Sequence, residues 1–464
     1  MLFSSITFLY YFFPIVLVLY FIVPKMFRNA ILLLTSLVFY AWGEPRYVFL
    51  MVISIICGYI CGLLIEKYKD KLPSKLALLA SCIISLGMLG YFKYADFFIT
   101  NFNTVTGLSV PLLKLALPIG ISFYTFQILS YTIDVYRGTV PAQRNPIDLA
   151  AYVTMFPQLI AGPIVRYSDV AKQLAERTHS VDKTAYGVRR FICGLSKKIF
   201  IANILGEFAG TFIDSKQQSV LFCWMYAAAY SLQIYFDFSG YSDMAVGLGK
   251  ILGFDFMENF NYPYISSSIT EFWRRWHISL GSWFRDYVYI PLGGNRVSKL
   301  KWLRNIFVVW MLTGFWHGAA WNFIVWGLYF AFFLIIEKLY LKNFLSEHKT
   351  AGHCYVLITV MISFVIFGAP NFKMAFDYIK GMFGMADLPL VTAETLYYLR
   401  SYAVIIAIAV IGATPLPKKL YSMAEKKFGT AAAIAEPCAI LILLFAATAY
   451  LVDGSFNPFL YFRF

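Results

Sequence analysis

The sequence predicts an all-α protein that crosses a membrane many times, built as a single domain over residues 1–464. Apolar residues make up 60% of the chain and charged residues only 14%, whereas soluble domains are usually about 45–50% apolar. No Asp, Glu, Lys or Arg occurs between Arg304 and Glu337, a run longer than the roughly 20 residues that a helix needs to cross a bilayer. A soluble fold has no place to bury so much apolar surface.

The apolar segments set the order of the expected helices. They cover residues 5–23, 29–43, 47–65, 76–95, 111–135, 147–165, 191–213, 219–238, 303–319, 321–341, 354–369, 402–416 and 431–452. Because segments shorter than about 17 residues are often re-entrant, we expect roughly ten or eleven full spans. Residues 156–167 contain two prolines, two small residues and a terminal arginine, which favours a re-entrant element that lines a cavity.

The net charge of +14 is interpreted as a topology signal, because the lysines and arginines gather in short loops between apolar segments. Cytoplasmic loops are enriched in these residues and lie next to anionic lipids. Placing residues 25–28, 66–75, 166–198 and 418–427 inside puts the N-terminus, residues 371–400 and the C-terminus outside. We therefore expect the lipid bilayer, and no nucleic acid, as the partner of these charges.

One aromatic segment, residues 269–290, does not have the composition of a spanning helix. At helical spacing, one stripe contains Ile269, Trp273, Trp276, Leu280, Trp283 and Tyr287, and the opposite side contains Glu271, Arg275, Ser282 and Asp286. A tryptophan-rich face opposite an arginine-bearing face is typical of a helix that lies in the membrane interface. His277 falls at the edge of the stripe.

His317 lies in the middle of an apolar run. It follows Arg304 by 13 residues, which places it roughly 20 Å from the charged end of a helix. An ionisable group at that depth is costly and usually faces a cavity or the bundle interior. The two interpretations are a neutral histidine bonded to a neighbouring helix, and a general base, for which an imidazole is well suited. The remaining histidines, His179, His348 and His353, are expected to be solvated.

The neighbours of His317 allow two interpretations as well. Gly314 and Gly318 either let another helix approach closely or leave room for a ligand beside the imidazole, and Trp316 and Trp321 are candidate pocket walls. For Asp237 and Asp243, structural packing is favoured over a chemical role. The cysteine spacing predicts no disulfide, and we expect no metal and no bound cofactor.

At this point the chain resembles a known family. The motifs that carry the resemblance are FYAWGEPRYV (39–48), FYTFQILSYTIDVYRG (123–138), FPQLIAGPIVRY (156–167), YFDFSGYSDMA (235–245), ENFNYPY (258–264), FWRRWHISLGSWFRDYVYIPLGGNR (272–296) and LTGFWHGAAWNFIVWG (312–327). Together they are specific and span nearly the whole chain. The sequence resembles the membrane-bound O-acyltransferase (MBOAT) family, and within it the bacterial alginate O-acetyltransferase branch.

The resemblance implies a ring of transmembrane helices, with re-entrant and interfacial helices, around a central tunnel. It implies that His317, in the WHG motif, is catalytic, and that His277, in RRWHISL, is the second site histidine. The tunnel candidates are Trp316, Gly318, Trp321, Asn322, Trp273, Arg274 and Arg275. It further implies a bacterial inner-membrane location and acetyl-CoA as cosubstrate. The implied acceptor is an extracytoplasmic polysaccharide, reached through a partner acetyltransferase of the SGNH type.

Two alternatives remain open from the sequence. One is D-alanyl transfer to teichoic acid from a carrier protein. The other is a transporter in which His317 relays protons, which predicts related half-helices in two halves of the chain. No such internal repeat is visible in the sequence.

Overall fold

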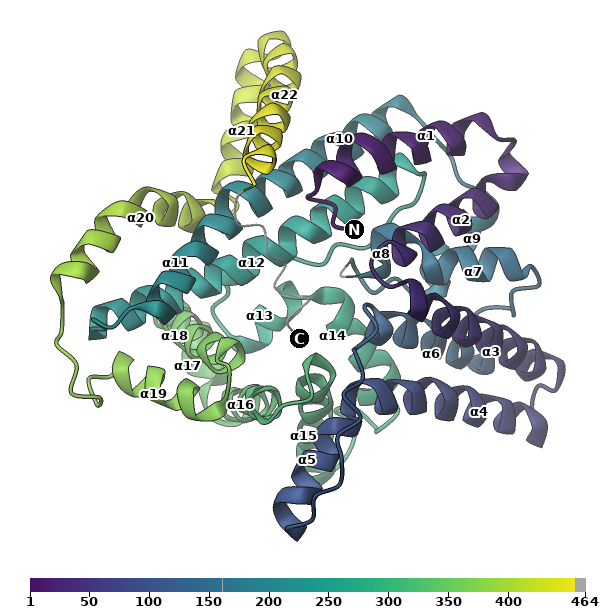
Figure 1. Cartoon of the computed structure of the whole chain (residues 1–464), viewed down its shortest axis with the longest axis horizontal. Helices are drawn as coiled ribbons and strands as arrows, with labels where there is room; N and C mark the ends of the chain where they lie inside the picture. The colour runs from purple at the N-terminus through teal and green to yellow at the C-terminus, as the bar shows by residue number, and fades with distance from the viewer. Residues whose placement is uncertain (161, 455–464) are drawn as a thin grey trace. The chain divides into compact units, whose positions relative to one another are not determined.

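The computed structural model describes residues 1–160 and 162–454, and these residues are helical with no β-strand (Figure 1). They divide into two compact units. The first comprises residues 1–191 and 242–257, and the second comprises residues 192–241 and those from 258 onward. Two of the unit boundaries fall within α10 (Val181–Ser196) and α12 (Val220–Ile251), and the third falls in the non-helical segment after α12. The single domain over residues 1–464 that the sequence predicts stays a prediction.

Six helical stretches among the described residues are long and apolar enough to cross a membrane: Pro45–Lys67, Leu72–Thr106, Trp321–Glu347, Lys349–Gly368, Ala393–Gly412 and Thr430–Val452. The prediction of an all-α, multi-pass membrane protein is confirmed. The count is below the expected ten or eleven, because several predicted segments form shorter or interrupted helices. The segment predicted at 111–135, for example, becomes helical only at Ile121.

The first unit is a set of packed helices. Its elements are η1 (Thr7–Phe12), α1 (Phe13–Ile22), η2 (Lys25–Phe27), α2 (Arg28–Ala41), η3 (Pro45–Tyr47), α3 (Val48–Lys67), α4 (Leu72–Leu89), η4 (Gly90–Tyr94), α5 (Ala95–Thr106), α6 (Ile121–Arg137), α7 (Pro146–Thr154), α8 (Phe156–Leu159), α9 (Tyr167–Ala175) and the start of α10. Helices α3, α4 and α6 pack against one another, and α7 packs on α2. Gly58 and Gly62 of α3 permit the contact with α6, because side chains there would meet Ile128 and Tyr131.

The segment expected to be re-entrant is broken and buried. Helix α7 ends before Met155, α8 is a single turn, and residues 160 and 162–166 are non-helical. Local bonds satisfy part of its backbone: the Phe156 N–H donates to Ser36 Oγ at 3.1 Å, and the Tyr152 hydroxyl donates to the Val165 carbonyl at 3.0 Å. Irregular backbone of this kind is tolerated at membrane depth only when protein or a cavity surrounds it, so the form fits the expectation.

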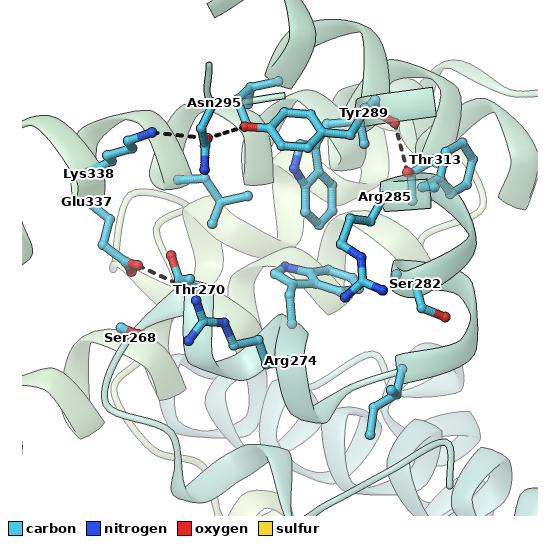
Figure 2. Close-up of a pocket in the computed structure, with 18 of the residues that line it drawn as sticks. Ser268, Thr270, Arg274, Ser282, Arg285, Tyr289, Asn295, Thr313, Glu337 and Lys338 are labelled. Atoms are coloured by element: carbon cyan, nitrogen blue, oxygen red, sulfur yellow. Dashed lines mark hydrogen bonds between the residues drawn. The ribbon is translucent and has the colours of Figure 1, made fainter. Parts of the chain in front are cut away.

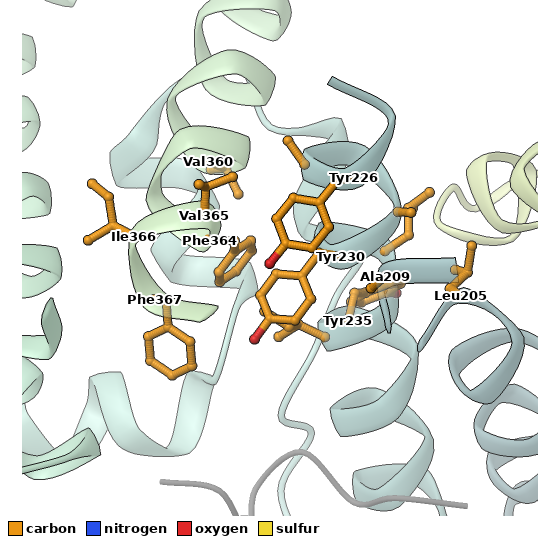
Figure 3. Close-up of a cluster of buried hydrophobic side chains, with 14 of the residues drawn as sticks. Leu205, Ala209, Tyr226, Tyr230, Tyr235, Val360, Phe364, Val365, Ile366 and Phe367 are labelled. Carbon is orange, nitrogen blue, oxygen red and sulfur yellow. The ribbon is translucent and has the colours of Figure 1, made fainter. Parts of the chain in front are cut away.

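The second unit carries most of the aromatic core. Its elements are η5 (Lys197–Ala202), α11 (Asn203–Asp214), α12, η6 (Pro263–Ile265), α13 (Ile269–Arg275), α14 (Ile278–Phe284), η7 (Arg285–Tyr289), α15 (Lys299–His317), α16 (Trp321–Ile336), η8 (Glu337–Leu341), α17 (Lys342–Glu347), α18 (Lys349–Gly368), α19 (Phe372–Met382), α20 (Ala393–Gly412), α21 (Leu416–Phe428) and α22 (Thr430–Val452). Figure 3 shows Tyr226 and Tyr230 of α12 facing Phe364 and Val365 of α18, all of them buried.

The prediction of one interfacial helix over residues 269–290 is wrong. The segment forms α13 and α14 with a break between them, because His277 adopts a left-handed backbone conformation with φ of 45°. Trp276 packs on Phe260, Phe272 and Phe364 instead of facing lipid. Leu280 and Trp283 are also buried. The aromatic stripe was a core signal, because a stripe buried by protein has the same spacing as one buried by lipid.

Helices α15 and α16 cross at glycine contacts. A Cβ atom on Gly327 would overlap the Trp310 carbonyl oxygen, and one on Gly314 would overlap the Phe323 carbonyl oxygen. Small residues at such positions let two helix backbones approach closely. The crossing places the C-terminal end of α15, which bears His317, against the N-terminal half of α16.

Gly327→Ala is expected to destabilise the protein, because overpacking a tight contact costs about 1–3 kcal/mol. Thermal unfolding of the detergent-purified protein measures the effect. Gly210→Ala is the matched control: Gly210 lies in α11 of the same unit, and its Cβ would meet nothing within 4 Å. Alanine is the better helix former, so the control should be neutral or stabilised. Equal melting temperatures for the two variants would contradict the packing argument.

Candidate active site

His317 ends α15 and lies among three aromatic rings. Its ring centroid is 5.0 Å from Trp316, 5.0 Å from Trp326 of α16 and 5.3 Å from Phe367 of α18. All three contacts are edge-on, with interplanar angles of 79° to 84°. The imidazole is half-buried, so three helices give it a largely apolar but still reachable environment.

His277 lies at the break between α13 and α14, with 1% of its surface exposed. Its ring centroid is 4.7 Å from Phe238 of α12 and 6.1 Å from Trp316. Since Trp316 also contacts His317, the structure brings both predicted histidines to the same indole, although 40 positions separate them in the sequence. The expectation that His277 lies at the edge of an interfacial helix is wrong, because its side chain is enclosed by protein.

Asn259 holds the turn that positions His277. Its side-chain carbonyl accepts from the Ser279 hydroxyl at 2.9 Å and from the Ser279 N–H at 3.2 Å, and its backbone carbonyl accepts from the Ile278 N–H at 3.0 Å. The Ser279 hydroxyl donates to Asn259, so its oxygen is free to accept from His277 Nδ1, 3.5 Å away. This pattern assigns the proton to Nδ1.

The remaining ring nitrogen, His277 Nε2, is buried and has no hydrogen-bond partner among the described residues. Burial lowers the pKa of the His277 imidazole to about 3. The ring is therefore neutral near pH 7, and Nε2 presents a lone pair that can accept a hydrogen bond.

The structure separates the predicted tunnel residues by environment. Trp316 is buried between the histidines, whereas Trp321 is 57% exposed and does not wall the site. Asn322 is buried and donates to the carbonyls of Phe367 and Ala369, at 3.4 and 3.3 Å. A Cβ on Gly318 would overlap the Phe323 ring, which favours close packing over space for a ligand at that glycine.

A cavity of about 910 Å³ opens beside these helices, within the second unit. Trp273 and Arg274 of α13 line it, together with residues of α14, α15, α16, η8 and α17. Arg275, the third candidate from α13, does not line it: it pairs with Glu271 at 2.9 Å and donates to the Asn261 carbonyl at 3.1 Å. Figure 2 shows Arg274 and Arg285 with hydroxyl-bearing residues around the space.

The charge of this cavity is mainly positive. Its cations are Arg274, Arg285, Lys338 and Lys342. Arg285 pairs with Asp286 at 2.6 Å, and Lys338 lies 4.1 Å from the centre of the Trp302 ring. Among the described residues, Arg274 and Lys342 form no hydrogen bond or ion pair. A cavity with cations, hydroxyl groups and indole rings suits a ligand that has both phosphates and an apolar or aromatic part.

Tryptophans form the wall between the cavity and His317. Trp273 and Trp310, which line the cavity, have ring centroids 4.6 Å apart, and Trp273 lies 5.7 Å from Trp326. Trp326 in turn contacts His317. The indole nitrogens of Trp273 and Trp326 are buried without a hydrogen-bond partner in the described part of the chain. The wall therefore contains N–H donors available to a polar group close to His317.

Glu337 was missed by the sequence analysis. It lies in η8, is 5% exposed, and its carboxylate accepts from the N–H groups of Ile269 at 2.6 Å and Thr270 at 3.0 Å. It therefore fixes the start of α13, whose Trp273 and Arg274 line the cavity; Figure 2 shows Arg274 beside it. The signal was a lone carboxylate at the end of a long apolar run, but its partners are 67 and 68 residues away in the sequence.

The two aspartates have the structural surroundings that were favoured for them. Lys198 and Asp237 form an ion pair at 2.7 Å with side chains only 4% and 3% exposed, and Asp243 pairs with Arg190 at 2.6 Å. Among the other histidines, His348 is exposed, as expected. His179 and His353 are half-buried and hydrogen-bonded, so the expectation that they are solvated is wrong.

The chain is similar in sequence to known proteins. Residues 140–376 match the MBOAT, membrane-bound O-acyltransferase family. Over its whole length the chain is 42% identical to the whole of a probable alginate O-acetylase AlgI of Azotobacter vinelandii. It is 36% identical to a peptidoglycan O-acetyltransferase of Helicobacter pylori, over 84% of this chain and 81% of that protein.

A teichoic acid D-alanyltransferase of Bacillus subtilis is 30% identical, over 54% of this chain and 67% of that protein. This similarity covers less of the chain than the similarity to the O-acetylating relatives.

Glu337→Ala is expected to lower the free energy of unfolding by roughly 2–6 kcal/mol, because two buried N–H groups lose their acceptor at about 1–3 kcal/mol each. Glu337→Gln keeps one acceptor oxygen and should fall between this variant and the parent. Thermal or denaturant unfolding in detergent measures the difference. Glu347→Ala, at an exposed end of α17, is the control. If Glu337→Ala were as stable as the control, Glu337 would not hold α13.

Proposed function

The chain belongs to the membrane-bound O-acyltransferase family, and from that premise we propose that this O-acyltransferase moves an acetyl group from cytoplasmic acetyl-CoA to a polysaccharide outside the cytoplasmic membrane of a bacterium. The observation that carries the proposal is the placement of both histidines on Trp316, next to a tryptophan wall that borders a cationic cavity. The full-length similarity to a probable alginate O-acetylase supports acetyl as the group and a polysaccharide as the acceptor.

The cationic cavity is the proposed donor site. Acetyl-CoA carries phosphates and an adenine ring at one end and a narrow, uncharged pantetheine arm with the thioester at the other. Arg274, Lys338 and Lys342 supply positive charge for the phosphates. Trp273 and Trp310 supply an apolar wall for the arm. The thioester would then lie at the wall that Trp326 shares with His317.

The proposed reaction needs one proton acceptor and one place for negative charge. His317 takes the proton from the acceptor hydroxyl while the hydroxyl oxygen bonds to the thioester carbonyl carbon. The carbon–sulfur bond then breaks, the acetyl ester is formed, and the proton leaves with the CoA thiolate. The buried indole N–H groups of the wall are suitable donors to the carbonyl oxygen as it becomes negative.

His277 has a supporting role in this proposal. It is neutral and fully enclosed, and its unpartnered Nε2 can accept a hydrogen bond from the acceptor hydroxyl or from a water molecule that the hydroxyl displaces. That role replaces the position at the edge of an interfacial helix that the sequence predicted. An extracytoplasmic SGNH-type acetyltransferase is proposed as the partner that takes the acetyl group onward to the polymer.

D-alanyl transfer to teichoic acid is the second candidate. It is favoured by the similarity to the Bacillus subtilis protein. Its donor is a carrier-bound thioester, which shares the pantetheine arm but not the nucleotide. Cations that bind a nucleotide phosphate therefore distinguish the two donors.

His317→Ala is expected to reduce acetyl transfer by at least about 10²-fold, the usual contribution of a general base, while the protein remains folded. Release of CoA thiol from acetyl-CoA, and acetylation of polysaccharide added together with the SGNH-type partner, measure the rate. His348→Ala, at an exposed histidine, controls for the substitution itself. A folded His317→Ala variant that transfers acetyl groups at the parent's rate would show that His317 is not the general base.

Arg274→Gln is expected to raise the KM for acetyl-CoA by roughly tenfold, the effect of one lost charge-assisted hydrogen bond, with a smaller effect on kcat. Lys301→Gln, at an exposed lysine of α15 that does not line the cavity, is the charge-matched control. Steady-state kinetics with varied acetyl-CoA separate the two parameters. A KM equal to that of the control would place the donor elsewhere.

A further inference from the structure

A cluster of cationic side chains lies in the first unit, where the first two helices meet the segment between α9 and α10. Arg28 begins α2, and Arg177 and His179 belong to the connecting segment. The guanidinium carbons of Arg28 and Arg177 lie 5.2 and 5.4 Å from the centre of the Tyr20 ring. Two positive charges are therefore held at one aromatic ring.

Neutral groups hold these two arginines in place. Arg177 donates to the Tyr20 hydroxyl and to the Asn29 side-chain oxygen, both at 2.6 Å. Arg28 donates to His179 Nδ1 at 3.3 Å, so the proton of that ring belongs on Nε2, which lies 3.1 Å from the Tyr20 hydroxyl oxygen. These contacts fix the geometry of the guanidinium groups but do not neutralise their charge.

The described residues supply no counter-ion for this pair of charges. Neither Arg28 nor Arg177 forms an ion pair, and Arg28 Nε is buried without a hydrogen-bond partner. The carboxylate of the network, Asp148, accepts from Asn29 at 2.7 Å and contacts neither guanidinium group. Lys183 is paired with Asp255 at 3.6 Å.

His179 does not change this balance. Its own burial, followed by the charges of Arg28 and Arg177, lowers the pKa of its imidazole, so the ring is neutral near pH 7. The cluster of Arg28, Arg177 and neutral His179 therefore has two positive charges and no acidic partner.

Exposed apolar side chains border the cluster. The Phe21 ring lies 5.7 Å from the Arg28 guanidinium carbon and 5.4 Å from the His179 ring. Phe21, Ile22 and Met26 are 44%, 75% and 79% exposed. The cluster lies at the end of the short apolar helical stretch Thr7–Ile22. A site with two fixed cations and an apolar border is complementary to a molecule with an anionic head and an apolar tail.

We propose that Arg28 and Arg177 bind the phosphate of an anionic phospholipid headgroup, whose acyl chains cover Phe21 and Ile22. Guanidinium groups bind phosphate oxygens with paired, charge-assisted hydrogen bonds. The loop at residues 25–28 is expected on the cytoplasmic side, where the lipid would belong to the inner leaflet. Free inorganic phosphate has the same head chemistry but makes no use of the apolar border.

The test uses the full-length protein purified in a non-ionic detergent. Its thermal unfolding is followed while phosphatidylglycerol, phosphatidylcholine or inorganic phosphate is added at matched concentrations. Phosphatidylglycerol should raise the melting temperature of the parent, and the other two should not. In Arg28→Gln the concentration of phosphatidylglycerol needed for half of the shift should rise about tenfold, the value of one charge-assisted hydrogen bond.

Two further variants keep the test specific. Lys172→Gln removes an exposed cation of α9 outside the cluster and should respond as the parent does. Arg28→Lys keeps the charge without the planar fork and should fall between the parent and Arg28→Gln. Each shift is measured from the lipid-free value of the same variant, so lower intrinsic stability does not obscure it. An unchanged response of Arg28→Gln, or equal stabilisation by phosphatidylcholine or inorganic phosphate, would overturn the proposal.

Discussion

The candidate active site depends on the enclosure of Trp316, the indole that touches both histidines. Trp316 is buried. Around the two histidines, Trp326 and Phe367 contact the His317 ring, and Phe238 contacts the His277 ring. Burial among these rings removes water from His277 and so disfavours its charged form. The neutral imidazole of His277 can accept a hydrogen bond. The close crossing of α15 and α16 at Gly314 and Gly327, together with the turn held by Asn259, brings these rings together.

Several polar groups inside this apolar protein are tied to a specific backbone feature or charge. The Glu337 carboxylate accepts hydrogen bonds from two N–H groups at the start of α13, and Asp237 forms an ion pair with Lys198. Buried polar groups without partners cost roughly 1–3 kcal/mol each, so the exceptions are informative. Buried atoms without a partner occur in several parts of the described chain. Three of them, His277 Nε2 and the indole nitrogens of Trp273 and Trp326, belong to the region where the donor and the acceptor are proposed to meet.

The composition of the sequence predicted the helical, multi-pass class. The isolation of His317 in an apolar run made it a candidate site residue. The sequence also made His277 a candidate site residue, but it predicted a membrane-interface environment instead of a protein interior. A stripe at helical spacing does not reveal whether lipid or protein covers it. The helix breaks at His277, whose backbone is left-handed, and the sequence gives no sign of this because the residue is not a glycine. Glu337 was missed because the N–H groups that it accepts from are distant in the sequence. Asn259 was missed because its hydrogen bonds stabilise a turn that the sequence does not predict. Gly318 was singled out correctly as unusual, but only the position of the Phe323 ring distinguishes packing from ligand space.

The central claim is that acetyl groups cross the membrane through this protein without their carrier. The direct measurement uses vesicles that contain the full-length protein with its cytoplasmic face outward. A soluble polysaccharide and the proposed SGNH-type partner are enclosed inside. Acetyl-CoA labelled separately in the acetyl group and in the nucleotide is added outside. The account predicts acetyl label on the enclosed polysaccharide and nucleotide label only outside. Both labels inside would indicate a transporter, and no acetyl label inside would contradict transfer across the membrane.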